Sequence, residues 1–204
     1  MPENLSCALI LLAAGASTRM GRPKQLLPVD GRPLLRLVVD TALAAPVSPV
    51  IVVLGAHAAL IRPCLDGLPV QIVVHDGWAE GMGSSLRTGM EALASIRPAP
   101  AGVVIALGDE PGFSADHLLR LIKTHGDTGR PIVASACDAV RRPPVFFSAK
   151  YFPALQALQG DAGAGQLLRA HPTEVATVQL AAVHDLDAPA DYADYLKRKP
   201  AAQA

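Results

Sequence analysis

The chain has 204 residues, of which 50% are hydrophobic and only 4% aromatic, so its core must consist mainly of Ala, Val, Leu and Ile. This length fits one domain, and this composition is typical of helices packed on a parallel sheet. The 18 basic and 18 acidic side chains give a net charge of zero. That balance argues against binding to nucleic acid or to a membrane surface, since both need an extended positive field.

The three cysteines are scattered, and neither they nor the six histidines pair at metal-ligand spacing. We therefore expect no disulfide framework and no zinc site. The apolar run near the N-terminus is too short to span a bilayer, and no basic region precedes it. These features predict a cytoplasmic protein.

Short apolar runs alternate with helix-like segments along the chain. The runs lack the polar alternation of half-exposed strands, and they predict strands covered on both faces. The predicted strands are residues 8–13, 50–54, 70–74, 103–107 and 132–136. The predicted helices are residues 34–43, 58–65, 83–94, 115–124, 149–158, 163–170 and 190–197. This order predicts a three-layer α/β/α, Rossmann-like fold with a mostly parallel sheet, formed by one domain over residues 1–199 and followed by a disordered tail at 200–204.

Two stretches break this rhythm. Residues 15–33 contain three glycines and three prolines, so they cannot form one helix. We predict a long ordered loop there, and such loops in compact domains usually carry function. Residues 141–187 contain a proline pair, a glycine-rich turn and strand-like pieces at 175–180 and 183–186. We interpret this stretch as a small lid-like extension built on the same sheet.

The first strand ends in a loop that carries the cations Arg19, Arg22 and Lys24. A buried strand that delivers a flexible backbone and several cations to one place suits a polyanion such as a nucleoside triphosphate, held by loop amides and side chains. The spacing from Gly15 to Gly21 fits neither the Walker A pattern nor the dinucleotide fingerprint. The alternative is an ordinary loop with solvated cations.

Asp109 follows the predicted strand at 103–107, and ligands of parallel sheets bind beyond the carboxyl ends of strands. It is therefore expected to face the loop after the first strand and to hold Mg²⁺, which binds one or two carboxylates together with substrate phosphate. Asp187 is the candidate for the second carboxylate. The alternative for Asp109 is a turn former, and for Asp187 it is a cap of the last helix. Glu110 is expected to face away.

The segment from Leu12 to Lys24 reads Leu-Ala-Ala-Gly-x-Ser-x-Arg-Met-Gly-x-x-Lys. This spacing resembles nucleotidyltransferases with a MobA-like fold and, more narrowly, the molybdenum cofactor cytidylyltransferases. Further segments similar to this family recur in order over most of the chain. They are Gly-Met-Gly-Ser-Ser-Leu at 81–86, Gly-Asp-Glu-Pro at 108–111, Gly-Asp-Ala-Gly-Ala at 160–164 and Asp-Leu-Asp-Ala-Pro at 185–189.

The resemblance implies transfer of CMP from CTP to a phosphate-bearing acceptor, molybdenum-bound molybdopterin, with release of pyrophosphate. It also implies Mg²⁺ as cofactor, and a molybdoenzyme or its chaperone as a further partner. The implied catalytic residues are Arg19, Lys24 and Asp109, with Asp109 and Asp187 on the metal. The implied nucleotide-binding residues are Leu12, Ala13, Ala14, Gly15, Lys24, Gly83, Ser84 and Ser85. The resemblance places Asp161 and Gly163 near the acceptor.

The chain departs from the family around the acceptor site. Relatives carry a Gly-x-x-Gly-x-Pro turn where this sequence has Ala139 and Arg142 in place of the two glycines. Because Arg142 cannot cheaply adopt a glycine-only conformation, the turn is expected to differ, and Arg141 and Arg142 become candidates for binding the acceptor's phosphate. Relatives also often carry Arg or Lys at the position of Gly165. The methyl group of Ala14, where guanylyl relatives carry glycine, favours CTP over GTP.

Three other interpretations remain open at this point. One is a nucleotidyltransferase that uses GTP, or a sugar phosphate or polyol phosphate as acceptor. The second is a nucleotide-binding escort protein without activity, which the missing glycines suggest and intact Lys24 and Asp109 disfavour. The third is a dinucleotide-dependent oxidoreductase, for which the glycine fingerprint is missing.

Overall fold

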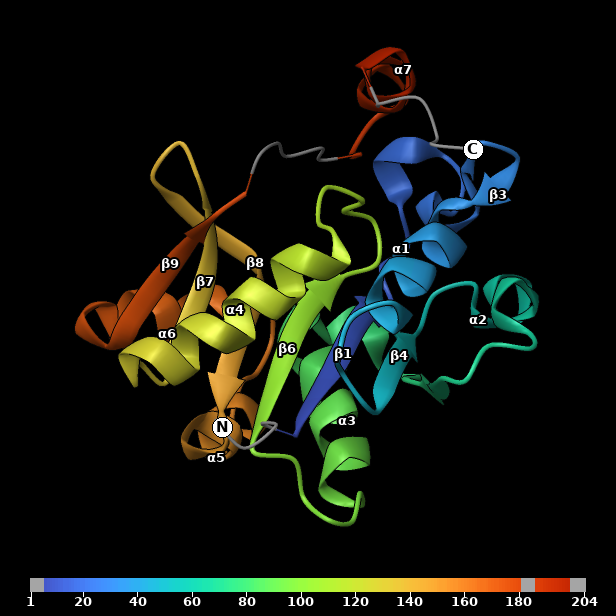
Figure 1. The fold of residues 1–204 in the computed structure, drawn as a ribbon. Helices are drawn as coiled ribbons and strands as arrows, with labels where there is room; N and C mark the ends of the chain where they lie inside the picture. Colours follow the sequence, from blue (N-terminus) through green and yellow to red (C-terminus); the bar gives the residue numbers. More distant parts are fainter. Residues whose placement is uncertain (1–5, 181–185, 199–204) are drawn as a thin grey trace.

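The structure is a computed structural model that describes residues 6–180 and 186–198. Its centre is a seven-stranded sheet in the order β5-β4-β1-β6-β8-β7-β9 (Figure 1). All neighbouring strands run parallel except at β8, which is antiparallel to both β6 and β7. The strands are β1 (Cys7–Ala13), β4 (Val50–Leu54), β5 (Gln71–Val74), β6 (Gly102–Leu107), β7 (Ile132–Cys137), β8 (Val140–Ser148) and β9 (Val175–Gln179).

Helices cover both faces of this sheet. One face carries α1 (Leu34–Leu43) and α4 (Ala115–Thr128), and the other carries α3 (Met82–Ala94), α5 (Phe152–Gln156) and α6 (Gly165–Ala170). The helices α2 (Ala58–Ile61) and α7 (Pro189–Arg198) lie at the periphery. The short 3₁₀ helices are η1 (Thr18–Met20), η2 (Lys24–Leu26), η3 (Arg62–Leu65), η4 (Trp78–Glu80), η5 (Ala149–Tyr151) and η6 (Pro172–Glu174).

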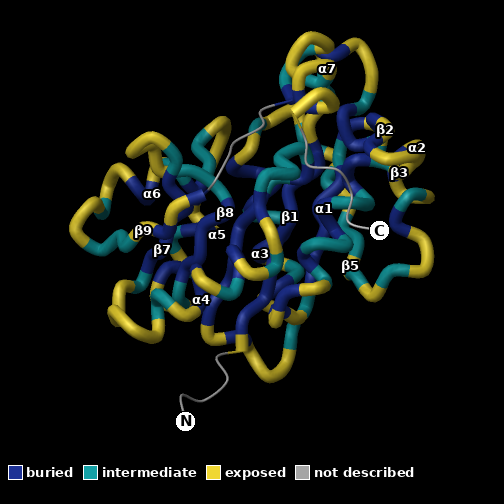
Figure 2. The backbone as a smooth tube through the Cα atoms, turned by 45° about the horizontal axis from the view of Figure 1, so that its top comes forward, coloured by how far each residue is buried: buried dark blue, intermediate teal, exposed yellow. Residues whose placement is uncertain are grey.

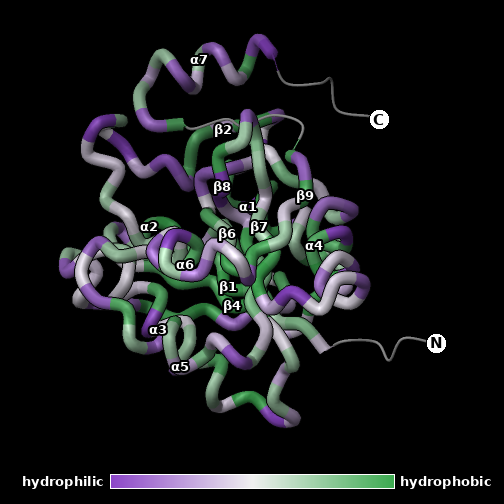
Figure 3. The backbone as a smooth tube through the Cα atoms, turned by 90° about the vertical axis from the view of Figure 1, so that its left-hand side faces the viewer, coloured by the Kyte–Doolittle hydropathy of each residue, from purple (hydrophilic) through white to green (hydrophobic). Residues whose placement is uncertain are grey.

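The apolar runs form a core on each side of the sheet because strand side chains alternate between its faces. In β1, Leu9 and Leu11 pack with α1 and α4, whereas Ile10 and Leu12 pack with α3. The whole of β1 is buried, as the dark central strands of Figure 2 show. The same strands form the hydrophobic centre of Figure 3, while polar segments lie outside. These observations confirm the predicted three-layer fold with a mostly parallel sheet.

The stretch after residue 141 differs in detail from the prediction. Its first part is β8, a nine-residue strand inside the sheet that the sequence pattern did not indicate. Two arginines and two prolines interrupt its apolar character, and a bulge at Ala134/Ser135 adjusts the pairing of β7 with it. The extension is therefore part of the sheet itself. Of the strand-like piece at 183–186, residues 183–185 lie outside the described residues, as does the tail at 200–204, and Leu186 is in no strand.

A tight hairpin joins β7 to β8. Asp138 and Ala139 have φ values of 48° and 64°, the left-handed conformation that both central residues of a type I′ turn require. Arg142 lies within β8 and needs no such conformation. The turn that the sequence led us to expect to differ is thus built with an alanine in a conformation that favours glycine.

Two further boundaries differ from the predicted ones. The helix expected over residues 58–65 divides into α2 and η3, because Pro63 has no N–H to donate to an α-helical hydrogen bond. The helix expected over 149–158 likewise begins as η5. Among the described residues, no helix is long and apolar enough to cross a membrane.

Candidate active site

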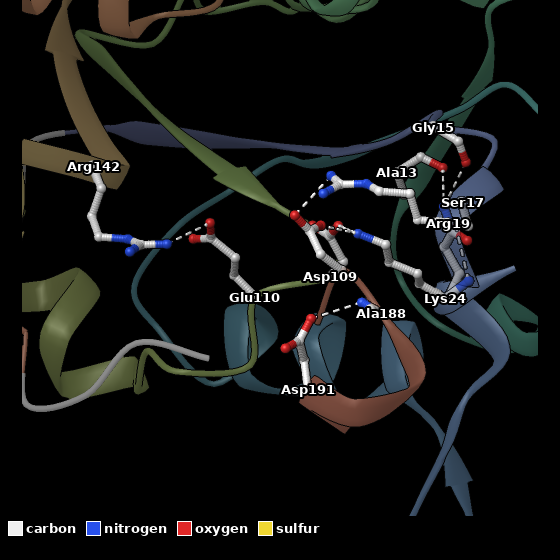
Figure 4. A network of polar contacts seen from close by, with 12 residues as sticks. Ala13, Gly15, Ser17, Arg19, Lys24, Asp109, Glu110, Arg142, Ala188 and Asp191 are labelled. Carbon is white, nitrogen blue, oxygen red and sulfur yellow. Dashed lines mark hydrogen bonds and ion pairs between the residues drawn. The ribbon is translucent and has the colours of Figure 1, made fainter. Parts of the chain in front are cut away.

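Cations from the loop after β1 meet carboxylates from two other parts of the chain. The Lys24 Nζ lies 3.1 Å from Asp109 Oδ2 and 2.6 Å from Asp187 Oδ1, and the Arg19 Nη2 lies 2.8 Å from Asp187 Oδ2. Figure 4 shows Lys24 reaching toward Asp109, with Arg19 on the same side of the site. Residues separated by 85 and 163 positions thus form one charged cluster.

Local structure places Lys24 at this point. Ser17 adopts a left-handed φ of 56°, and its hydroxyl accepts a hydrogen bond of 3.1 Å from the Lys24 backbone N–H. Lys24 then begins η2, and its side chain is only 10% exposed. A nearly buried ammonium requires a partner of opposite charge, and the two carboxylates supply it.

The cluster shifts the pKa values of Lys24 and Asp187. Burial disfavours the charged form of Lys24, but hydrogen bonds and Coulomb attraction to Asp187 and Asp109 outweigh burial and raise the pKa of its ammonium. The hydrogen bond from Lys24 lowers the pKa of Asp187, and the charge of Arg19 adds to this effect. The Lys24 ammonium and the Asp187 carboxylate therefore stay charged at neutral pH.

Asp187 precedes α7, and its side chain does not serve as a cap. The backbone N–H of Ala188 donates instead to Asp191 Oδ2, at 2.7 Å. The Asp187 carboxylate is thereby available for Lys24 and Arg19. Glu110 turns away from the cluster and forms an ion pair of 3.0 Å with Arg142 (Figure 4).

Gln25 is a site residue that the sequence analysis missed. It is 4% exposed, and its Nε2 donates hydrogen bonds to the carbonyl groups of Ala13, at 3.0 Å, and Gly15, at 3.3 Å. The carbonyl between them, of Ala14, accepts from the Ala56 N–H at 2.9 Å. Three successive carbonyl groups of the loop thus have protein donors. The only signal in the sequence that could have indicated a role for Gln25 is its position next to Lys24.

Two cavities adjoin this cluster, and a third adjoins the second of them. The first, of about 170 Å³, holds Arg19, Lys24, Asp109 and Asp187. The second, of about 410 Å³, shares Leu12, Gly15 and Asp109 with the first. The third, of about 270 Å³, shares Leu12, Met82, Leu107 and Asp161 with the second. The predicted residues Leu12, Ala13, Ala14 and Gly15 all line the first or the second cavity.

The two serines at the start of α3 have different surroundings. Ser85 lines the second cavity, together with Ala14 and Trp78. Ser84 is fully buried, where its hydroxyl donates to the Gly81 carbonyl at 2.8 Å and lies 2.9 Å from His75 Nε2. Both partners are protein groups, so Ser84 positions the turn before α3, whereas Ser85 faces the cavity.

The glycines near α3 allow two turns to pack together. The Gly83 N–H donates to the Gly160 carbonyl at 2.8 Å. A Cβ added to Gly81, whose φ is 117°, would lie 2.4 Å from the Gly160 oxygen, and one added to Gly163 would lie 2.6 Å from the Met82 sulfur. A side chain at Gly81 would therefore separate the turns, because it meets backbone atoms, whereas one at Gly163 would displace the Met82 side chain.

The predicted acceptor residues line the third cavity. Asp161, Gly163, Arg141 and Arg142 all belong to its wall. The Arg142 charge is paired with Glu110, and both of these side chains are less than 20% exposed. Arg142 is thus already neutralised by a protein carboxylate, whereas Arg141 is exposed.

Comparison with known proteins identifies the family. A family model described as the MobA-like NTP transferase domain matches residues 9–175. The chain belongs to this family. It is 37% identical to nicotine blue oxidoreductase of Paenarthrobacter nicotinovorans over 80% of this chain and 81% of that protein, and 32% identical to the purine catabolism protein PucB of Bacillus subtilis over 93% and 95%.

Solved structures with a similar fold agree with this assignment. Rv0371c from Mycobacterium tuberculosis superposes with a TM-score of 0.80 at 31% identity, over 95% of this chain and 99% of that one. A structure of Rv0371c in complex with manganese gives a TM-score of 0.79 at 30% identity, over 95% and 100%. The family match confirms the predicted resemblance to MobA-like nucleotidyltransferases.

Proposed function

We propose that this protein transfers CMP from CTP to a phosphate-bearing acceptor, molybdenum-bound molybdopterin, and releases pyrophosphate. The observation that carries the proposal is the convergence of Lys24 with Asp109 and Asp187 beside a phosphate-sized cavity and a larger one. Phosphoryl-type transfer requires positioning and neutralisation of charge rather than a protein nucleophile, and these residues can supply both.

Each residue of the cluster has a separate task in this reaction. The Ala13–Gly15 backbone and the Arg19 guanidinium bind the triphosphate, with the loop held in place by Gln25. An oxygen of the acceptor's phosphate attacks the α-phosphorus in line and forms the new P–O bond, while the bond from the α-phosphorus to the bridging oxygen breaks and pyrophosphate leaves. Lys24 neutralises negative charge on the phosphates, an effect of about 3–4 kcal/mol by analogy with an oxyanion donor.

The donor set fits a divalent metal ion. The Asp109 and Asp187 carboxylates already accommodate one cation, the Lys24 ammonium, between them, and hard oxygen ligands of this kind suit Mg²⁺ or Mn²⁺. We therefore assign a divalent-metal role to Asp109 and Asp187. Such an ion, when bound, supplies positive charge to the phosphate oxygens.

The second cavity is the proposed base pocket. Ala14, Trp78 and Ser85 line it, so it offers a small apolar contact, an aromatic surface and one hydroxyl. The Ala14 methyl group narrows the space for a purine and favours cytosine, although a contact of this size discriminates by only about 1–3 kcal/mol.

A pyrophosphate-release assay tests the proposal. Purified protein is incubated with Mg²⁺ and either CTP or GTP, with molybdenum-bound molybdopterin, a sugar phosphate or a polyol phosphate as acceptor. We expect release with CTP and the molybdopterin acceptor. Release only with GTP, or only with a sugar or polyol phosphate, contradicts the proposed substrates. Binding of CTP without release under any condition favours an escort protein.

A further inference from the structure

We propose that Tyr192 and Tyr195 of α7 are positioning residues of the active site. They dock α7 on the hairpin that follows η2, and the docked helix holds the Asp187 carboxylate against Lys24 and Arg19. The metal role of Asp187, on which this inference rests, belongs to the proposed function. Neither tyrosine is among the described residues that line the three cavities, so both act on the site from outside.

The helix α7 depends on contacts with the rest of the protein. It has ten residues, and an isolated helix shorter than about 12–15 residues is only marginally stable in water. The ion pair of Asp187 with Arg19 adds little to its attachment, because these side chains are 40% and 73% exposed and solvent-exposed pairs are weak. Figures 2 and 3 show α7 beside β2 (Pro28–Val29) and apart from the central sheet. Side chains of α7 that pack on this neighbouring segment must therefore hold the helix in place.

Two tyrosines of α7 supply these contacts. Tyr192 and Tyr195 are three residues apart and lie on one face of the helix. The Tyr192 hydroxyl donates a hydrogen bond to the Pro28 carbonyl, and the centroid of its ring lies 5.9 Å from Arg22 Cζ. Tyr195 is only 8% exposed, and burial together with the charge of Asp30 raises the pKa of its hydroxyl. Both tyrosines therefore face the loop and hairpin after β1.

This hairpin is firmly attached to Lys24. Its second strand, β3 (Arg32–Pro33), is antiparallel to β2. At its base, the Leu27 N–H donates to the Lys24 carbonyl at 3.0 Å, and the Leu34 N–H donates to the Leu27 carbonyl at 2.9 Å. Val29 is 1% exposed and belongs to the hydrophobic core. A helix docked on the hairpin therefore has a fixed place relative to Lys24.

The start of α7 connects the docked face to Asp187. The Tyr192 N–H donates to the Ala188 carbonyl at 3.3 Å, and the Ala188 N–H donates to Asp191 Oδ2 at 2.7 Å. These bonds fix the conformation between Tyr192 and Asp187, so docking of the tyrosine also sets the position of the carboxylate. Asp109 follows the end of β6 and does not depend on α7. A divalent ion would thus have one carboxylate from the sheet and one from the docked helix.

The test measures binding without turnover. Isothermal titration calorimetry gives the affinity of the full chain for Mn²⁺ with inorganic tripolyphosphate, in the absence of nucleotide and acceptor. Tyr192→Ala and Tyr195→Leu should each weaken this affinity about tenfold, and Asp187→Asn at least as much. Tyr192→Phe, which keeps the ring and loses the hydrogen bond to Pro28, should have a smaller effect. Lys197→Ala, which truncates a side chain of α7 that is 74% exposed, is the matched control and should leave the affinity unchanged.

A double mutant separates positioning from a general structural role. In the Asp187→Asn background, Tyr192→Ala should cause no further loss of affinity, because the carboxylate that it positions is already absent. A loss through Arg22, whose guanidinium the tyrosine ring contacts, would instead appear in both backgrounds. Hydrogen exchange reports on the docking itself. The amides of residues 192–198 should exchange faster in Tyr192→Ala than in wild type, and those of α4 should not change.

Three results would overturn the proposal. They are wild-type affinity in Tyr192→Ala, an equal loss of affinity from Tyr192→Ala in both backgrounds, and unchanged hydrogen exchange in α7. Wild-type affinity in Asp187→Asn would overturn both this proposal and the metal role of Asp187. Because neither CTP nor an acceptor is present, a failure of the CTP reaction leaves these measurements unaffected. The two proposals can therefore fail separately.

Discussion

Two polar clusters in the described part of the chain differ in composition and in role. The first is the open cluster of Lys24, Asp109, Asp187 and Arg19, whose carboxylates are 35% and 40% exposed toward a cavity. The second is the closed cluster of Arg120, His117, Ser135 and the Pro144 carbonyl, between α4 and the β7–β8 pair.

The closed cluster is a complete chain of hydrogen bonds. Arg120 donates to His117 Nδ1 at 3.2 Å, so the proton of the neutral ring is on Nε2, which donates to Ser135 Oγ at 2.8 Å. The Ser135 hydroxyl then donates to the Pro144 carbonyl at 2.7 Å. His117 and Ser135 are both at least 99% buried. The chain lies at the register shift between Ala134 and Ser135, where Pro143 and Pro144 of β8 have no partner in β7.

The contrast teaches how a functional cluster differs from a structural one. In the closed cluster the His117 and Ser135 side chains each donate to one protein acceptor and are out of contact with solvent, and only Arg120 reaches the surface. In the open cluster four charged groups line one cavity. Phosphate can replace the carboxylates as the partner of the cations, and a divalent cation can replace Lys24 as the partner of the carboxylates. Disruption of the open cluster should therefore lower activity, and disruption of the closed one should lower stability.

The largest expected effect is at Lys24. Lys24→Met should reduce turnover by roughly 10²–10³-fold, because it removes a charge that stabilises the transition state. Pyrophosphate release under saturating nucleotide measures it, and Lys123→Met, on the exposed face of α4, is the matched control. Near-normal turnover in Lys24→Met would remove Lys24 from the chemistry and with it the contrast between the clusters.

The contribution of the closed cluster to the free energy of unfolding should depend on pH. Burial, with help from the charge of Arg120, lowers the pKa of His117 from 6.5 to about 4. The stability contribution is complete above about pH 6.5 and is lost as the pH falls toward 4, because the unfolded chain takes up the proton first. Urea unfolding of wild type should show a loss of about 3 kcal/mol over this range that His117→Gln lacks. Equal losses in both proteins would contradict a buried neutral ring.

Ser135 should contribute to stability and not to activity. Ser135→Ala leaves the His117 N–H and the Pro144 carbonyl without partners, at a cost of about 2 kcal/mol. Urea unfolding at pH 7.5 measures the cost, with turnover measured on the same preparation. A large loss of turnover with unchanged stability would reverse the roles assigned to the two clusters.

Gln25 lines the cavity of the open cluster, although its side chain is buried. Gln25→Leu removes the donor to two loop carbonyls and should raise the KM for the nucleotide about tenfold, or about 1.4 kcal/mol, with a smaller change in kcat. Gln25→Asn, whose shorter amide cannot reach both carbonyls, should restore only part of the binding. A lower melting temperature without any change in KM would make Gln25 a purely structural residue.

The smallest effect concerns the hairpin beside the closed cluster. Ala139 has a φ of 64°, so Ala139→Gly should raise the free energy of unfolding by up to about 1 kcal/mol. Ala99→Gly, in an exposed loop without positive φ, is the control and should give no gain. Thermal unfolding of both variants measures the difference, and an equal change in both would show that strain at Ala139 is negligible.

The sequence predicted the parts that depend on local pattern. The runs at β1, β4 and β6 are continuously apolar, so they could be recognised as buried strands. The motif around Lys24 and the acid after β6 also follow from position, because carboxyl ends of parallel strands meet at one edge. The β8 strand could not be recognised, because its arginines and prolines interrupt the apolar run that is expected of a strand paired on both sides.

The contacts of individual side chains also depended on the tertiary structure. Nothing in the sequence indicates that Glu110 neutralises Arg142 from 32 residues away. The closed hydrogen-bond chain of His117 likewise requires the bulge between β7 and β8, which no local pattern predicts.

The most direct test of the account is a thermal-shift comparison of wild type and Asp109→Asn with CTP, GTP, ATP and NAD, each with and without Mg²⁺. A ligand that binds the native state raises the melting temperature by mass action. We predict that CTP with Mg²⁺ gives the largest rise in wild type, that most of the Mg²⁺-dependent part is lost in Asp109→Asn, and that NAD gives none. An equal rise in both proteins, or a rise with NAD and not with CTP, would contradict a triphosphate and metal site built on Lys24 and Asp109.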